Sequence, residues 1–148
     1  MTTNGQVNRS PVEILLVEDN PGDARLAQEA LKEGKICNNL HIVEDGEEAL
    51  SFLRQEGRYA GSTRPQLILL DLYLPKKDGR EVLAEMSEDP DLRQTAVIIL
   101  TTSESDQDIL QMYNLSADRY ILKPVDLEQF VKVIKSIKGL CFAVVPAA

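Results

Sequence analysis

The chain has 148 residues, and 16 Lys and Arg against 24 Asp and Glu give it a net charge of −8. With 43% hydrophobic and 27% charged residues, the composition is typical of one globular domain and argues against a disordered chain. The acidic balance argues against binding to DNA or to an anionic membrane surface, and no apolar run approaches the ~20 residues of a membrane-spanning helix.

Short apolar runs alternate with segments of helical period along the chain. Residues 14–17, 67–70 and 97–100 are apolar throughout, whereas a strand with one face in water alternates apolar and polar residues. These three runs therefore predict parallel strands that helices cover on both faces. The full set of predicted strands, in chain order, is 12–17, 40–43, 66–70, 96–100 and 118–122.

A helical segment follows each predicted strand. The first begins with the cap and first turn at Asn20-Pro21 and ends at Gly34. The last spans 127–137, where apolar residues recur with a helical period and Asp126 with Gln129 fits a capping box. Five such units with right-handed crossovers give an α/β, doubly wound (βα)5 fold with a five-stranded parallel sheet. The other predicted helices follow Asp45-Gly46, follow Gly79 and lie around 106–115.

The chain divides into a domain over 12–138, a flexible N-terminal arm over 1–11 and an apolar C-terminal tail over 139–148. The arm contains no apolar segment typical of a secretion signal. Cys37 and Cys141 follow no spacing typical of disulfides or metal sites, so we expect reduced thiols and a cytoplasmic location. One histidine and no close cysteine pair exclude a zinc site.

Complementary polar residues end the predicted strands. In an open parallel sheet, the carboxyl ends of the strands form the ligand-binding edge. Three carboxylates at that edge would raise one another's pKa unless a cation joined them, and ligands made only of oxygen select Mg²⁺ or Mn²⁺. The second strand ends in Glu44-Asp45, which we expect to face water. The other four strand ends are Glu18-Asp19, Asp71, Thr101-Thr102 and Lys123-Pro124.

The same edge suits phosphoryl transfer. Asp19 and Asp71 would bind the cation directly, and the longer Glu18 would act through water. Lys123 supplies a fixed positive charge, and Thr101 supplies a hydroxyl donor for phosphoryl oxygens. Asp71 lies between the acidic pair and the Thr/Lys side, which makes it the best-placed nucleophile. Each residue alone has an ordinary explanation as a turn, cap or surface residue, but their joint occurrence at four strand ends favours the chemical one.

Four ordered motifs within 12–138 resemble the receiver domain of two-component response regulators. The resemblance implies a flavodoxin-like fold with strand order 2-1-3-4-5. Residues 64–83 are further similar to the small single-domain response regulators that are paired with cyanobacterial phytochromes. The four motifs are 16–20 (LVEDN), 69–79 (LLDLYLPKKDG), 99–102 (ILTT) and 120–124 (YILKP).

The resemblance implies how the acidic residues are used. Asp71 would accept a phosphoryl group from a phosphohistidine on a sensor histidine kinase. Asp19, Asp71 and the backbone carbonyl of Tyr73 would hold Mg²⁺, which Mn²⁺ could replace. Glu18 would support the ion through water.

The resemblance also implies which residues bind the phosphoryl group and transmit its presence. Thr101 and Lys123 would hold the group, with Thr102 beside it. Tyr120 matches an aromatic switch position, whose side chain turns inward when Thr101 moves. The Lys123-Pro124 bond would be cis, a geometry essentially restricted to bonds before proline. The fourth helix, fifth strand and fifth helix would form the switch surface.

Residues 139–148 leave no room for a DNA-binding or enzymatic output domain after the receiver. We therefore expect a signalling protein that acts through protein contacts and is no enzyme beyond self-catalysed phosphotransfer and dephosphorylation. Its expected partner is a sensor histidine kinase of the phytochrome type. The apolar tail either folds back on its own domain or joins the switch surface in a homodimer.

Tyr73 and Thr102 are larger than the residues usual at their positions in the family. Both would shield an acyl phosphate from water, which predicts a long-lived phosphorylated form, unless Tyr73 only covers the rim of the site. Tyr73 also argues against an aspartate-nucleophile phosphohydrolase, which needs an acid two residues after its nucleophile. A flavodoxin-like electron carrier is disfavoured because Glu18-Asp19 would repel a flavin phosphate and the chain has no Trp.

Overall fold

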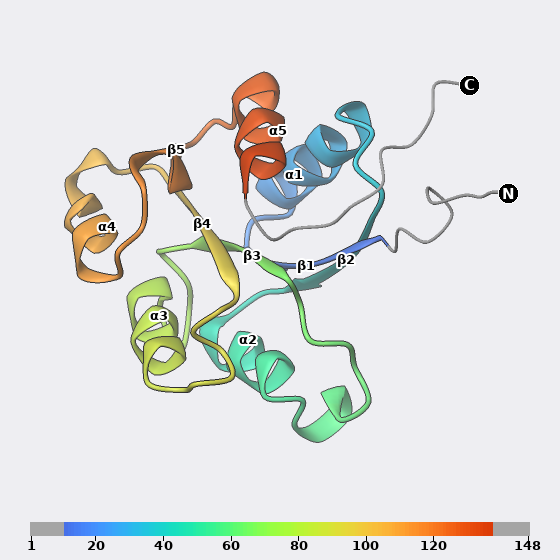
Figure 1. Ribbon diagram of the computed structural model, residues 1–148, viewed down its shortest axis with the longest axis vertical. Helices are drawn as coiled ribbons and strands as arrows, with labels where there is room; N and C mark the ends of the chain where they lie inside the picture. The colour runs from blue at the N-terminus through green and yellow to red at the C-terminus, as the bar shows by residue number, and fades with distance from the viewer. Residues whose placement is uncertain (1–10, 138–148) are drawn as a thin grey trace, which may run out of the picture.

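Five parallel strands form one sheet in the order β2-β1-β3-β4-β5 (Figure 1). This computed structural model describes residues 11–137, so nearly all of the predicted arm (1–11) and the whole predicted tail (139–148) lie outside the described residues. The order and the parallel pairing confirm the flavodoxin-like doubly wound fold. The strands are β1 (Val12–Val17), β2 (Asn38–Val43), β3 (Leu67–Asp71), β4 (Ala96–Thr101) and β5 (Tyr120–Leu122).

Helices cover both faces of the sheet. Figure 1 shows α1 and α5 together on one face and α2 and α3 on the other. Ile109 of α4 packs into the same half of the core as α2 and α3. The α-helices are α1 (Pro21–Glu33), α2 (Gly46–Leu53), α3 (Gly79–Ser87), α4 (Asp108–Met112) and α5 (Leu127–Ser136). Short 3-10 turns lie at η2 (Gly57–Tyr59), η3 (Glu104–Asp106) and η4 (Ala117–Arg119).

The sheet divides the core into two halves, and alternate strand residues enter each half. Leu15 and Val17 of β1 pack with α2 and α3. Ile14 and Leu16 of the same strand pack with α1 and α5. All four side chains are fully buried. The central strands are apolar throughout because both of their faces are covered.

The largest differences from the predicted element boundaries are in β2, β5 and the fourth helix, whereas β3 and β4 differ by at most one residue at each end. β2 begins at Asn38, because its pairing starts opposite the first residue of β1 and not at the first apolar side chain. β5 begins only at Tyr120, since residues 117–119 form a 3-10 turn. The fourth helix is shortened to Asp108–Met112, because a separate 3-10 turn occupies residues 104–106.

Side-chain caps orient the helices that leave the carboxyl edge of the sheet. Asn20 Oδ1 accepts a 3.0 Å hydrogen bond from the Asp23 N–H, so the predicted cap of α1 is confirmed. Asp126 caps α5 in the same way, by accepting from the Gln129 N–H. A capping box with both of its hydrogen bonds is present at α3, between Asp78 and Glu81. These side chains satisfy backbone N–H groups that a helix start leaves unpaired.

Asp45 does not face water, contrary to the prediction for the end of the second strand. Its side chain is mostly buried and accepts a 2.7 Å hydrogen bond from the Glu48 N–H at the start of α2. Lys76 Nζ lies 3.6 Å from its other carboxylate oxygen. The capping bond is the reason for the difference, because a cap side chain folds back over the first helical turn.

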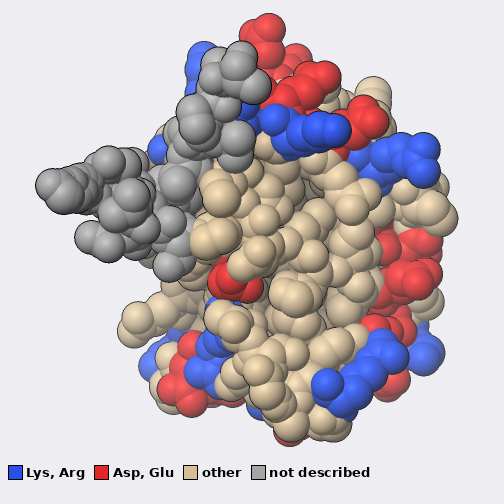
Figure 2. All heavy atoms as spheres, turned by 90° about the vertical axis from the view of Figure 1, so that its right-hand side faces the viewer, with Lys and Arg blue, Asp and Glu red and all other residues tan. Residues whose placement is uncertain are grey.

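β2 is an edge strand of the sheet, and none of its six residues is Lys, Arg, Asp or Glu. Figure 2 shows acidic and basic side chains gathered around the rim of this side of the molecule, with uncharged residues over its middle. Ile42 of β2 is 40% exposed, as expected for an edge strand.

None of the described helices is long and apolar enough to cross a membrane.

α3 packs closely on the end of β3 because its first residue has no side chain. A Cβ atom on Gly79 would lie 2.6 Å from the Asp71 carbonyl oxygen and 2.7 Å from the Leu72 Cα. The Gly79 N–H donates a 2.8 Å hydrogen bond to the Leu72 carbonyl. A larger residue must therefore push the helix away from the strand end.

Gly79→Ala is expected to lower the free energy of unfolding by about 1–3 kcal/mol, because the added methyl group would collide with backbone atoms. Gly61→Ala is the control, since a Cβ there meets nothing within 4 Å. It should change the free energy by less than about 1 kcal/mol, in the stabilising direction. Urea unfolding followed by circular dichroism measures both variants, and equal stabilities would contradict the packing argument.

Candidate functional site

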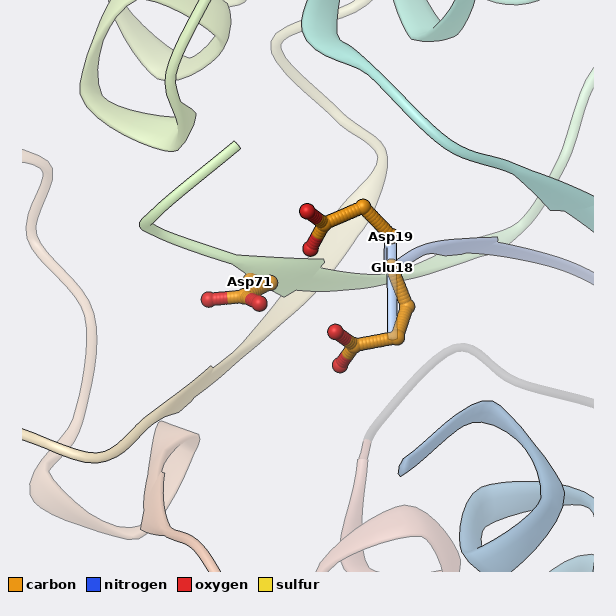
Figure 3. A group of neighbouring side chains, drawn as sticks. All are labelled: Glu18, Asp19 and Asp71. Atoms are coloured by element: carbon orange, nitrogen blue, oxygen red, sulfur yellow. The ribbon is translucent and has the colours of Figure 1, made fainter. Parts of the chain in front are cut away.

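Three carboxylates from two strand ends meet at the carboxyl edge of the sheet. Glu18 and Asp19 follow β1, and Asp71 is the last residue of the adjacent β3. One carboxylate oxygen of each lies within 4.8 Å of the others (Figure 3). Val17 of β1 pairs with Leu70 of β3, so the two strands end at the same level of the sheet and bring these residues together.

The three carboxylates differ in burial. Glu18 is 2% exposed and Asp71 is 6% exposed. Asp19 is exposed. The cluster is therefore open to solvent on the Asp19 side, while Glu18 and Asp71 form its buried part.

Lys123 follows β5 and reaches into the same cluster. Its Nζ lies 2.6 Å from Glu18 Oε1, 2.9 Å from Asp23 Oδ2 and 3.1 Å from Asp71 Oδ2. One ammonium thus contacts three carboxylates, and Asp19 lies beside two of them; with all four acids ionised, the formal charge of the group is 1 − 4 = −3. This excess of negative charge favours a further cation at the same place.

The pKa values at the cluster follow from burial and from these contacts. Burial raises the pKa of the Glu18 carboxyl to about 7; the hydrogen bond from Lys123 opposes the rise and Asp71 adds to it. Burial alone would lower the pKa of the Lys123 ammonium, but its hydrogen bonds to Glu18 and Asp23 raise it above its usual range. Lys123 therefore keeps its charge at neutral pH, whereas Glu18 stands close to the pH at which it loses its proton.

The loop after β3 is held against Asp71 by its own backbone. The Tyr73 N–H donates a 3.0 Å hydrogen bond to Asp71 Oδ1, the pattern of an Asx turn. The Tyr73 side chain is 55% exposed, and its hydroxyl donates to Asp106 in the loop after β4. The backbone of Tyr73 is therefore at the site, while its ring reaches the neighbouring loop.

Thr101 and Tyr120 belong to the strands on the other side of β3. Thr101 is fully buried, and its Oγ1 accepts a 3.3 Å hydrogen bond from the Ser103 N–H. Tyr120 is turned inward and 7% exposed, and its hydroxyl donates to the Ser103 carbonyl. The Lys123 N–H donates to the Thr101 carbonyl at 2.8 Å, and the Lys123-Pro124 bond is cis. These bonds tie the ends of β4 and β5 together.

The side chain of Thr102 is exposed, unlike that of its neighbour Thr101. Asp23 is a site residue that the sequence predictions did not include. It lies in the first turn of α1, three residues after the capping Asn20. An acid in the first turn of a helix that directly follows the strand-end acids is the signal that would have identified it.

The donor set fits a hard divalent cation. Glu18, Asp19 and Asp71 offer only oxygen atoms, which suits Mg²⁺ or Mn²⁺ better than softer metals. Within residues 11–137, this is the one group of three or more acidic, histidine or cysteine side chains arranged to hold an ion.

The receiver domain profile of response regulators matches residues 14–135. The chain belongs to the response regulator receiver family. Response regulator Rcp1 from Synechocystis sp. is 47% identical to it over 140 residues, which span 93% of this chain and 95% of Rcp1. The solved structure of the phosphorylated cyanobacterial phytochrome response regulator RcpA is 46% identical, with a TM-score of 0.73, and the match covers 90% of this chain and 99% of RcpA.

A second solved structure, the Mn²⁺-bound form of Rcp1, is 45% identical with a TM-score of 0.72. The match covers 93% of this chain and 100% of that chain. The 148 residues thus hold one receiver domain closely related to phytochrome response regulators. The family resemblance of the four sequence motifs and the narrower resemblance of residues 64–83 are both confirmed.

Neutralising Asp19 is expected to relieve repulsion within the acidic cluster. In a buffer with EDTA, Asp19→Asn should raise the free energy of unfolding by up to about 1 kcal/mol, because it removes a negative charge next to Glu18 and Asp71. Asp91→Asn is the control, since it removes an exposed acid from the loop between α3 and β4. Urea unfolding measures both, and a destabilised Asp19→Asn would argue against net repulsion.

Proposed function

We propose that this receiver domain accepts a phosphoryl group on Asp71 from a phosphohistidine of a sensor histidine kinase. The carrying observation is the position of the buried Asp71 carboxylate, which lies beside the acidic pair after β1 and 3.1 Å from the Lys123 ammonium. A carboxylate nucleophile with a fixed cation beside it suits the transfer of a group whose oxygens are negative. Output then passes through protein contacts.

The acidic cluster is the proposed Mg²⁺ site. Asp19, Asp71 and the backbone carbonyl of Tyr73 would bind the ion, with Glu18 supporting it through water. Mn²⁺ is the proposed substitute, and the related Rcp1 has been solved in a Mn²⁺-bound form. When bound, the ion offsets the excess negative charge and stabilises the phosphoryl oxygens during transfer.

The transfer exchanges one bond to phosphorus for another. An Asp71 carboxylate oxygen bonds to phosphorus while the bond between phosphorus and the histidine nitrogen breaks, and the nitrogen keeps the electron pair. The Lys123 ammonium, which contacts Asp71 Oδ2 directly, would turn to a phosphoryl oxygen. The buried Thr101 hydroxyl would move to donate to a second oxygen. This movement would shift the loop after β4, because the N–H of Ser103 in that loop donates to Thr101 and its carbonyl accepts from Tyr120.

The proposed partner is a kinase of the phytochrome type. The sequence identity of 47% with Rcp1 and of 46% with the phytochrome response regulator RcpA supports this proposal. The proposed role is signalling in the cytoplasm without contact to DNA or membranes. A phosphohydrolase is not favoured, because Tyr73 stands two residues after Asp71, where such an enzyme needs an acid.

The test is incubation with acetyl phosphate and Mg²⁺, read by the mass of the intact protein. The wild type should gain the mass of one phosphoryl group, and Asp71→Asn should not. Asp45→Asn is the matched control, because it also changes a mostly buried aspartate after a strand, and asparagine caps a helix equally well. Phosphorylation of Asp71→Asn, or its loss in Asp45→Asn, would contradict the assignment.

We propose further that the face of α4, β5 and α5 forms a homodimer. Met112 of α4 is 62% exposed and Leu122 of β5 is 36% exposed, so both elements carry an exposed apolar side chain. Met112→Glu should therefore shift sedimentation from dimer to monomer, whereas Leu26→Glu, which changes an exposed apolar residue of α1, should not.

The predicted contribution of the tail, 139–148, is tested by truncation after residue 138, and a monomeric wild type would remove the dimer proposal.

A further inference from the structure

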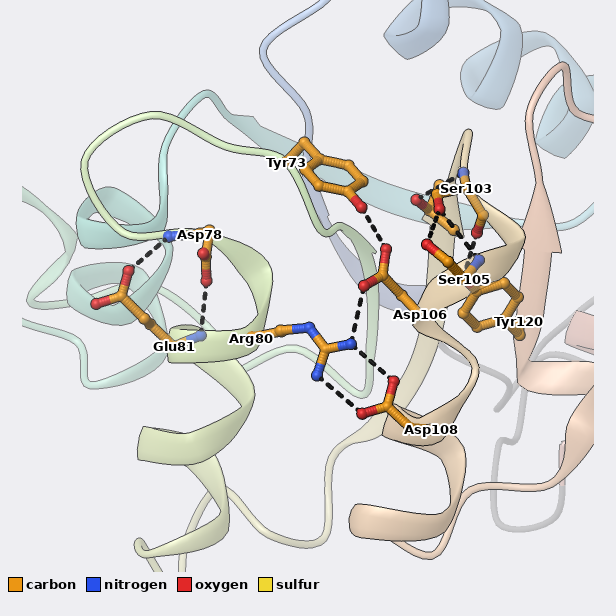
Figure 4. Close-up of polar contacts among 10 residues, drawn as sticks. Tyr73, Asp78, Arg80, Glu81, Ser103, Ser105, Asp106, Asp108 and Tyr120 are labelled. Carbon is orange, nitrogen blue, oxygen red and sulfur yellow. Dashed lines mark hydrogen bonds and ion pairs between the residues drawn. The ribbon is translucent and has the colours of Figure 1, made fainter.

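A polar network outside the acidic cluster joins the loop after β3 to the loop after β4. The Tyr73 hydroxyl donates to Asp106 Oδ2, and Arg80 Nη2 lies 2.9 Å from Asp106 Oδ1. The same guanidinium contacts both carboxylate oxygens of Asp108, at 2.8 Å and 3.4 Å. Figure 4 shows Tyr73 and Arg80 approaching Asp106 from different sides, with Arg80 between the two aspartates.

Asp106 is the central acceptor of this network. Its side chain is 16% exposed, so both donors reach it at a largely shielded position. The hydrogen bonds from Tyr73 and Arg80 lower the pKa of the Asp106 carboxyl, which keeps it ionised at neutral pH. The bond to Asp106 raises the pKa of the Tyr73 hydroxyl, so that group stays a donor.

Arg80 stands at a position that local helix structure does not favour. It is the second residue of α3, where the positive end of the helix dipole disfavours a cation. Its two partners, Asp106 and Asp108, lie 26 and 28 positions further along the chain. Asp108 is the first residue of α4, where an acid is favoured. The fork of Arg80 therefore joins the start of α3 to the start of α4.

The network runs beside the proposed phosphoacceptor. The Tyr73 N–H donates to the Asp71 carboxylate, so the backbone from which the ring extends lies directly next to the site. The ring ends on Asp106, in the 3-10 turn that follows β4 and the buried Thr101. Tyr73 therefore spans from the loop after β3 to the loop after β4, and these two loops border Asp71.

We propose that Asp106 and Arg80 are positioning residues that hold the Tyr73 ring as a strap beside the phosphorylated Asp71 and thereby lengthen the life of the acyl phosphate. This inference rests on the proposed function and deepens it. In hydrolysis, a water oxygen bonds to phosphorus while the bond from phosphorus to the Asp71 oxygen breaks. The carboxylate leaves with the electron pair, and the proton of the water passes to the released phosphate. A ring fixed at both ends restricts the approach of that water.

The test follows the decay of the phosphorylated full chain after loading with acetyl phosphate and Mg²⁺ and removal of the donor. Tyr73→Phe removes only the hydroxyl, and Asp106→Ala removes its acceptor. Each should speed hydrolysis about three- to tenfold, the effect of losing one hydrogen bond of ordinary strength. Arg80→Gln should speed it less. Glu104→Ala, which removes an exposed carboxylate from the same loop, is the control and should leave the rate unchanged.

The double variant of Tyr73→Phe with Asp106→Ala separates a strap from a general disturbance of the loop. Its rate should equal that of Asp106→Ala alone, because both changes remove the same bond. Hydroxylamine, a small nucleophile that attacks acyl phosphates, should consume the phosphorylated variants faster by a similar factor. An unchanged rate in Tyr73→Phe, rates that multiply in the double variant, or an equal acceleration by Glu104→Ala would each overturn the proposal.

Failure of the strap and failure of the proposed function give different results. If Asp71 is not the acceptor, the wild type and Asp71→Asn show the same gain of mass, or neither gains any. If Asp71 is the acceptor but Asp106 and Arg80 do not position Tyr73, all variants are loaded and decay at the wild-type rate. A Mg²⁺ titration of Asp106→Ala and of Arg80→Gln should give the wild-type affinity, because neither residue belongs to the acidic cluster.

Discussion

The Lys123 ammonium is the group on which the arrangement of the site depends. It contacts Glu18 after β1 and Asp71 at the end of β3, while its own backbone follows β5. One cation therefore links three strands and allows two carboxylates to be buried at 2% and 6% exposure. The same ammonium is outnumbered by acids, so the site keeps the negative charge that a divalent ion requires. Removal of Lys123 would leave buried carboxylates without their cation, which is costly for folding.

The fold was predictable because its central strands are covered on both sides. The unbroken apolar runs of β1, β3 and β4 follow from that burial, and the caps at Asn20 and Asp126 mark the starts of two helices. The edges of the sheet were predicted less well. β2 starts at Asn38, where backbone pairing includes two polar residues, and β5 starts at Tyr120, after the 3-10 turn at 117–119.

The site was predictable where topology alone brings residues together. Glu18, Asp71 and Lys123 each stand at a strand end, so parallel pairing was enough to place them at one edge. Asp23 and Asp106 were not predicted, because their contacts depend on how far a partner's side chain reaches from a loop or helix start. Asp45 was predicted wrongly for a related reason, since the helix that follows it turns its side chain inward. Local patterns do not encode these choices.

The two ends of the shortest ion pair in the cluster, Glu18 and Lys123, are 105 positions apart in the chain and 2.6 Å apart in space. During synthesis, the first half of the site leaves the ribosome long before the second half exists. A chain that lacks β5 and the residues after it holds these acids without their ammonium. The complete charge arrangement of the site therefore forms only after the last strand has docked.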